Sequence, residues 1–143
     1  MFKLSESKPM TQRFGIDTSI LVRLVTGEPP QAFDEAVSAL TRMVEREHVS
    51  LLASNMVIGE AYIALQHHYQ VSKPRAKAAL SSVLTSGLVA PSGGQPVLDA
   101  LAASRGCGLL DRLIALQYQA ENLATLTLDR KMATLPQFTR LTV

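Results

Sequence analysis

The chain of 143 residues has a single cysteine, Cys107. One thiol cannot form an intramolecular disulfide, and it supplies neither a zinc cluster of several cysteines nor a CxxC redox pair. The sequence also lacks any run of about 18 apolar residues, and no apolar stretch of signal-peptide length opens it. These absences predict a cytoplasmic protein rather than an exported or membrane-inserted one.

The sequence has little excess charge of either sign. Its net charge is +2, and its 14 basic residues are spread along the chain. This distribution excludes an extended basic tail of the kind that binds nucleic acids. The 47% hydrophobic and 18% charged content is typical of one compact globular domain. Mild basicity permits a phosphate-bearing partner without demonstrating one.

Short apolar runs alternate with amphipathic stretches along the chain. The runs predict strands at 13–16, 49–53, 88–90, 124–127 and 139–143. Six helices are expected between them, the first capped by Thr18 or Ser19, the third by Ser54 or Asn55, and the fifth spanning 97–105. Because parallel strands need long crossover connections, this alternation predicts a three-layer α/β/α sandwich around a mainly parallel sheet.

Four acidic residues stand in apolar or small-residue surroundings: Asp17, Glu60, Asp111 and Asp129. Asp17 and Asp129 each follow a predicted strand directly, at the sheet edge where open α/β folds bind ligands. Helix capping is the alternative role for the three aspartates, and the sequence leaves both interpretations open. Capping does not explain Glu60, which lies about six residues into its helix.

Convergence of these carboxylates would require a cation. Two unit charges at 4 Å repel by about 4 kcal/mol at an effective dielectric of 20. All-oxygen ligands suit Mg²⁺ or Mn²⁺, and the lack of a Cys/His cluster argues against zinc. Such an ion would orient and deprotonate an attacking water and stabilise charge on a scissile phosphate.

Four short motifs surround the four acids: Ile16-Asp17-Thr18-Ser19, Ser54 to Tyr62 around Glu60, Leu110-Asp111-Arg112-Leu113-Ile114-Ala115 and Thr125-Leu126-Thr127-Leu128-Asp129-Arg130. In this order they resemble the PIN-domain family and particularly its VapC-type toxins. The resemblance covers residues 14–143, which predicts a single PIN-like domain. Residues 1–13 are then an N-terminal extension, either mobile or the product of a start codon upstream of the real one, with Met10 as the alternative start.

The resemblance implies a Mg²⁺- or Mn²⁺-dependent endoribonuclease that cleaves structured RNA such as tRNA or rRNA. Asp17, Glu60, Asp111 and Asp129 would be its catalytic and metal-binding set, with Ser19 and Thr127 as supporting polar groups. Toxins of this kind are commonly homodimers, neutralised by a small antitoxin that covers the active-site groove. Two departures are visible: Ser19 replaces a frequent Asn, and Gly108 replaces a further Asp, which weakens a second metal site.

Four basic residues lie close in sequence to the acids and are predicted RNA contacts: Arg23, Arg112, Arg130 and Lys131. The planar guanidinium of arginine suits phosphate. The alternative is that they are exposed side chains that balance the local acids.

Two other functions compete with the ribonuclease. Asp17 follows a strand and precedes Thr18, as in phosphotransferases of the haloacid-dehalogenase type, but that family's second Asp is replaced by Ser19. The other is a catalytically silent PIN module that only binds RNA or protein. Retention of all four acids disfavours it.

Overall fold

The computed structural model describes residues 12–143, so most of the predicted N-terminal extension lies outside the described residues. The first part of the chain comprises β1 (Arg13–Ile16), α1 (Thr18–Thr26), α2 (Pro30–Arg46), β2 (Ser50–Ala53), α3 (Asn55–His68), α4 (Lys73–Leu84) and β3 (Ala90–Pro91). The second part comprises α5 (Gln95–Ala102), α6 (Leu109–Ala120), β4 (Thr125–Thr127), the short 3₁₀-helix η1 (Met132–Thr134) and β5 (Phe138–Arg140).

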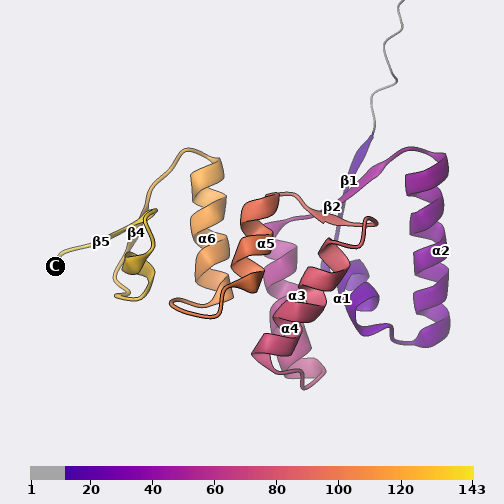
Figure 1. Cartoon of the computed structure of the whole chain (residues 1–143), viewed down its shortest axis with the longest axis horizontal. Helices are drawn as coiled ribbons and strands as arrows, with labels where there is room; N and C mark the ends of the chain where they lie inside the picture. Colours follow the sequence, from indigo (N-terminus) through magenta and orange to yellow (C-terminus); the bar gives the residue numbers. More distant parts are fainter. Residues whose placement is uncertain (1–11) are drawn as a thin grey trace, which may run out of the picture.

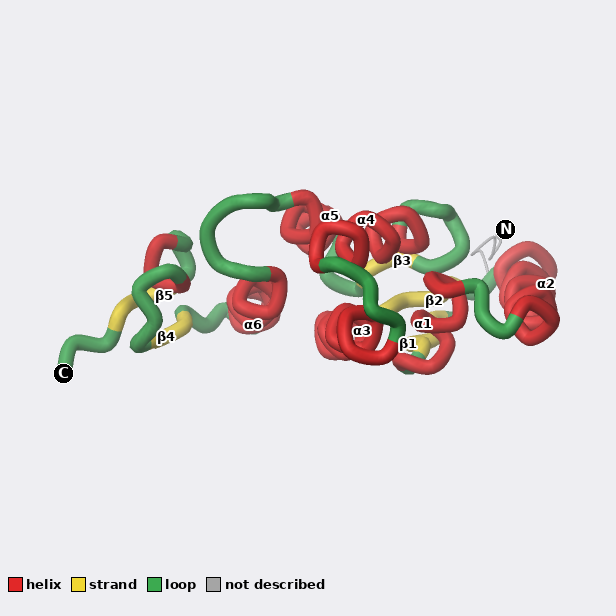
Figure 2. The backbone as a smooth tube through the Cα atoms, turned by 90° about the horizontal axis from the view of Figure 1, so that it is seen from below, coloured by secondary structure: helices red, strands yellow, loops and turns green. Residues whose placement is uncertain are grey.

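All the strand pairs are parallel. β2 lies between β1 and β3, with Phe14 opposite Leu51 and Ala53 opposite Pro91. The strands form a middle layer with helices on both sides (Figure 2), which confirms the three-layer α/β/α prediction. Helices fall between the strands because each parallel connection must cross from one end of the sheet to the other.

Local sequence signals place most element ends. Ser54 and Ser72 cap α3 and α4 by accepting hydrogen bonds from backbone amides in the first turn. The prediction for α1 was wrong in one detail, because its cap is Asp17 rather than Thr18 or Ser19. The fifth helix begins two residues earlier than expected, with a proline in its first turn, and ends at Ala102 because Ala103 is extended.

The hydrophobic core lies between the sheet of β1–β3 and the helices packed on it. Its largest fully buried side chains are Leu21, Ile58, Leu65, Leu80, Val89 and Val97. The cluster of buried residues runs from Ile16 to Leu113, so the segment after α6 contributes little to it. None of the described helices is long and apolar enough to cross a membrane.

The last two strands form a sheet of their own. β4 pairs with β5 in parallel, with Thr125 opposite Phe138. Figures 1 and 2 both show this pair beyond α6, at the end of the molecule away from β1. The alternation of strands and helices suggested one continuous sheet. The described chain instead has one of three strands and one of two.

Asn55 joins α3 to α6 inside the protein. Its side chain is 7% exposed, and its Nδ2 donates a hydrogen bond to the Leu113 carbonyl oxygen at 3.1 Å. The Oδ1 of Asn55 has no hydrogen-bond partner within the described residues. Nearby, Leu110 Cδ2 lies 3.1 Å from the position that a Cβ on Gly59 would occupy. A glycine at 59 therefore lets α6 approach α3 closely.

Removing the Asn55 amide should loosen this helix contact. We expect Asn55→Ala to lower the free energy of unfolding by about 1–3 kcal/mol, because a buried hydrogen bond and its packing are removed. Urea denaturation followed by circular dichroism measures this change. The control is Ser82→Ala on the exposed side of α4, which should change stability by less than about 0.5 kcal/mol. Equal stabilities for the two variants would contradict the assigned role.

Candidate active site

The first site residue, Asp17, stands directly after β1 and caps α1. Its Oδ1 accepts hydrogen bonds from the Ser19 hydroxyl at 2.6 Å and from the Ile20 amide at 3.3 Å. These bonds, that of Ser19 first, lower the pKa of Asp17 below its usual value. The carboxylate is therefore ionised at neutral pH, and Ser19 is in contact with the acid it was predicted to support.

Glu60 is hydrogen-bonded to Thr18, the residue that follows Asp17. It is an exposed residue of α3, and the Thr18 Oγ1 donates to its Oε1 at 2.5 Å. Thr18 was not among the predicted site residues. The signal that could have found it is its position directly after Asp17, where a hydroxyl can reach a neighbouring helix. We call the two acids Asp17 and Glu60, together with Thr18 between them, the N-terminal acidic pair.

Asp111 and Asp129 form a second, C-terminal acidic pair. Asp111 lies in the first turn of α6 and is partly buried, but no side chain caps that helix. Burial raises the pKa of Asp111, and the negative charge of Asp129 raises it further. The structure thus brings together two carboxylates that are 18 positions apart in the sequence, close enough to repel.

Asp129 is held in place by its own loop. Its Oδ1 accepts hydrogen bonds from the backbone amides of Lys131 at 2.7 Å and Met132 at 3.0 Å, at the start of η1. The amide of Asp129 donates to the Thr127 Oγ1 at 3.0 Å. Thr127, predicted as a supporting polar group of the acidic set, is therefore bonded to the backbone of Asp129. The predicted capping role is confirmed for Asp17, whereas Asp129 orders the loop before η1, whose cap position is Lys131.

The structure does not bring all four acids together. Within residues 12–143, no three His, Cys, Asp or Glu side chains lie close enough to hold a metal ion. The two acidic pairs are linked through the residues that precede Glu60 and Asp111 in the sequence. These are Gly59 and Leu110, which pack against each other. The predicted four-carboxylate metal site stays a prediction.

The donor chemistry nevertheless fits a hard divalent cation. Each pair presents carboxylate oxygens, accompanied by the hydroxyls of Ser19, Thr18 and Thr127. Oxygen ligands of this kind are those of Mg²⁺ and Mn²⁺. In the C-terminal pair the negative charge of Asp129 raises the pKa of Asp111, and a bound cation would offset that repulsion. The residues therefore suit a metal once the two pairs meet.

The predicted RNA contacts have different surroundings. Arg23, Arg130 and Lys131 are at least partly exposed. Arg112 is partly buried, and its Nε donates to the Cys107 carbonyl at 3.1 Å while one terminal nitrogen donates to the Arg105 carbonyl. Arg112 therefore holds the loop before α6, and only its remaining donors are free for phosphate.

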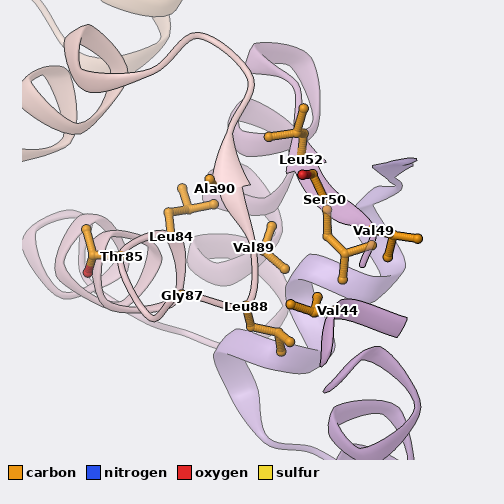
Figure 3. Close-up of a pocket in the computed structure, with 11 residues that line it drawn as sticks. Val44, Val49, Ser50, Leu52, Leu84, Thr85, Gly87, Leu88, Val89 and Ala90 are labelled. Atoms are coloured by element: carbon orange, nitrogen blue, oxygen red, sulfur yellow. The ribbon is translucent and has the colours of Figure 1, made fainter. Parts of the chain in front are cut away.

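A cavity of about 400 Å³ lies away from the acids. Val49, Leu51, Val89 and Gly87 line it with residues from the ends of α2 and α4 (Figure 3). It adjoins the residues that lead into β2 and β3, whereas Asp17 follows the carboxyl end of β1. Since parallel sheets bind ligands at the carboxyl ends of their strands, we assign this mostly apolar cavity to packing rather than to a site.

The chain matches a known protein family. No curated protein matches the chain. A family model described as "PIN domain" matches residues 15–137, a range that contains all four acids of the two pairs. PIN domains are generally metal-dependent nucleases that act on nucleic acid. With most of its described length matched, this chain belongs to the PIN-domain family.

Proposed function

We propose that the protein is a Mg²⁺- or Mn²⁺-dependent endoribonuclease and the toxin of a toxin–antitoxin pair. The observation that carries the proposal is the PIN-domain match over residues 15–137, and it is supported by the C-terminal acidic pair, in which burial and the charge of Asp129 raise the pKa of Asp111. Mutual repulsion of two carboxylates costs folding energy, so a purely structural role gives no reason for it. A bound cation would explain why the two carboxylates lie near each other.

The acids would bind the metal, and the neighbouring hydroxyls would orient their carboxylates by hydrogen bonds. Asp17, Glu60, Asp111 and Asp129 are the proposed ligands. A bound Mg²⁺ or Mn²⁺ supplies Lewis acidity, which lowers the pKa of water and stabilises charge on a phosphate. Ser19 keeps Asp17 ionised, and Thr18 fixes the Oε1 of Glu60.

The toxin role rests on the resemblance to VapC-type proteins. A small antitoxin that covers the acidic groove is the proposed protein partner, and structured RNA such as tRNA or rRNA is the proposed substrate. Single-stranded loops of folded RNA expose bases and phosphates together, which suits a site with accessible cations beside it. Arg23, Arg130 and Lys131 are those cations.

Cleavage of RNA tests the enzymatic proposal. We expect purified protein free of any partner to produce discrete fragments from total cellular RNA with Mg²⁺ or Mn²⁺, and none with EDTA. Asp17→Asn should reduce the rate by at least about a hundredfold, because the metal loses one charged ligand. Gel analysis with end mapping of the fragments measures the rate and identifies the cleavage site.

The matched control is Asp34→Asn, the same chemical change on the surface of α2, which should leave the rate unchanged. Intact RNA with folded wild-type protein would contradict the proposal and would favour a silent module that binds RNA or protein. Equal loss in the two variants would remove Asp17 from the site.

The cations beside Asp129 should bind the RNA backbone. We expect Arg130→Gln with Lys131→Gln, made in the non-cleaving Asp17→Asn protein, to weaken RNA binding. The slope of log affinity against log salt should become shallower by roughly one for each phosphate that the protein no longer neutralises. Fluorescence anisotropy over a salt series measures both quantities. Arg42→Gln on α2 serves as the control, and an unchanged slope in the double variant would exclude these residues as RNA contacts.

A further inference from the structure

The outer edge of β1 has no strand beside it in the described part of the chain. β1 pairs with β2 on one side only, and its first three residues are exposed, including Phe14 at 36%. Strands of parallel sheets are normally covered on both faces, and an unpaired edge exposes a row of backbone donors and acceptors. β1 therefore has the surroundings of an edge strand.

The outer edge of β4 is equally open. Among the described strands β4 pairs only with β5, and two-stranded sheets are marginally stable alone in water. Leu126 and Leu128 are 65% and 64% exposed, and Leu141 is also exposed. The exposed face of α6 adds Ile114 and Tyr118. Apolar exposure of this extent indicates a surface that another polypeptide covers.

The two open edges belong to opposite ends of one chain. Figures 1 and 2 show α3 between α6 and β1, with β4 and β5 beyond α6. α6 is fixed to α3 by the Asn55 hydrogen bond and by the contact of Leu110 with Gly59. Packed helices therefore lie between β1 and β4 of a single copy and prevent these two strands from pairing.

The connection from α6 to β4 is too short and too ordered to bypass them. It comprises residues 121–124, which reach at most about 14 Å when fully extended. Most of it is bound in the turn that ends α6, where the Leu123 amide donates to the Tyr118 carbonyl at 2.9 Å and Asn122 has φ of 60°. This turn sets the direction in which β4 leaves α6.

We propose that a second copy of this chain supplies the missing strand: β4 and β5 of each copy add to the β1 edge of the other. The exchange is reciprocal, so it closes into a two-fold dimer with no edge of β1 or β4 left open. It also covers Leu126 and Leu128, which lie on or next to the transferred strand. Both sheets are parallel, so each could continue the other without reversal of strand direction.

The exchange completes the acidic site. Asp17 follows β1 and Asp129 follows β4, so parallel pairing of these strands places both aspartates at the same edge of the joined sheet. Each site then takes Asp17 and Glu60 from one copy and Asp129 from the other. This consequence rests on the proposed function, whereas the strand exchange itself does not.

The first test is physical and independent of activity. Light scattering should give a mass twice the 15.5 kDa of one chain. In a Cys107→Ser background, one copy carries Arg13→Cys at the start of β1, and a longer, tagged copy carries Ala124→Cys next to the start of β4. Adjacent strands lie about 4.8 Å apart, so a short bismaleimide should join the co-expressed copies into a product with both masses.

Placing the first cysteine at Ser82 on α4 instead of at Arg13 is the matched control and should give no such product. A chain that carries both Arg13→Cys and Ala124→Cys tests the alternative, in which β1 and β4 of the same copy pair with each other. Cross-linking of that chain to itself at the mass of one copy would overturn the exchange. A monomeric mass for the wild-type protein would overturn it as well.

The second test uses activity to ask which copy supplies which acid. Asp17→Asn and Asp129→Asn should each inactivate the protein alone. When the two variants are co-expressed, each mixed dimer contains one site with neither change, so about a quarter of wild-type activity should return with random pairing. No recovery with a cross-linked, active wild-type dimer would overturn the shared site. No activity in the wild type itself would count against the proposed function and leave the cross-link as the test of the exchange.

Discussion

Hydrogen bonding along the edges of β1 determines where the site can form. The inner edge is paired with β2, and that pairing fixes the end of β1 and with it the place of Asp17. The outer edge is free among the described strands, and β4, which Asp129 follows closely, lies at the other end of the molecule. In the proposed exchange, Asp129 of one copy meets Asp17 of the other when β4 pairs with that open edge.

Electrostatics gives the two acidic pairs different characters. The N-terminal pair is relaxed, because hydroxyls of Ser19 and Thr18 donate to Asp17 and Glu60, and the pKa of Asp17 is lowered. The C-terminal pair is strained, because burial and the charge of Asp129 raise the pKa of Asp111. The ionised carboxylates of the N-terminal pair would attract a cation shared between the pairs. The same cation would offset the repulsion between Asp111 and Asp129.

Much of the fold could be predicted from local signals. Apolar runs of four or five residues located β1 and β2, and serine caps located the starts of α3 and α4. The shift of α5 shows the limit of periodicity, since the proline in its first turn, and not the apolar spacing, set where it begins. Asp17 as a cap was foreseen as an alternative role, but its assignment to α1 required the backbone angles.

The sequence predicts a set of site residues and not their arrangement. Asp17 and Asp129 lie just after short apolar runs that predict strands, which a sequence shows. The donation from Thr18 to Glu60 and the link from Asn55 to α6 join residues 42 and 58 positions apart, and no local pattern encodes such pairs. The separation of β4 from β1 was also invisible, because strand order in a sheet depends on contacts between distant segments.

The most direct measurement is Mn²⁺ binding by isothermal titration calorimetry, on wild-type protein and on Asp111→Asn, with Asp34→Asn as the control. The account predicts that wild-type and Asp34→Asn proteins bind Mn²⁺ alike, and that Asp111→Asn binds at least about tenfold more weakly. Absence of binding to folded wild-type protein, or equal binding by Asp111→Asn, would contradict the claim that these carboxylates form a metal site.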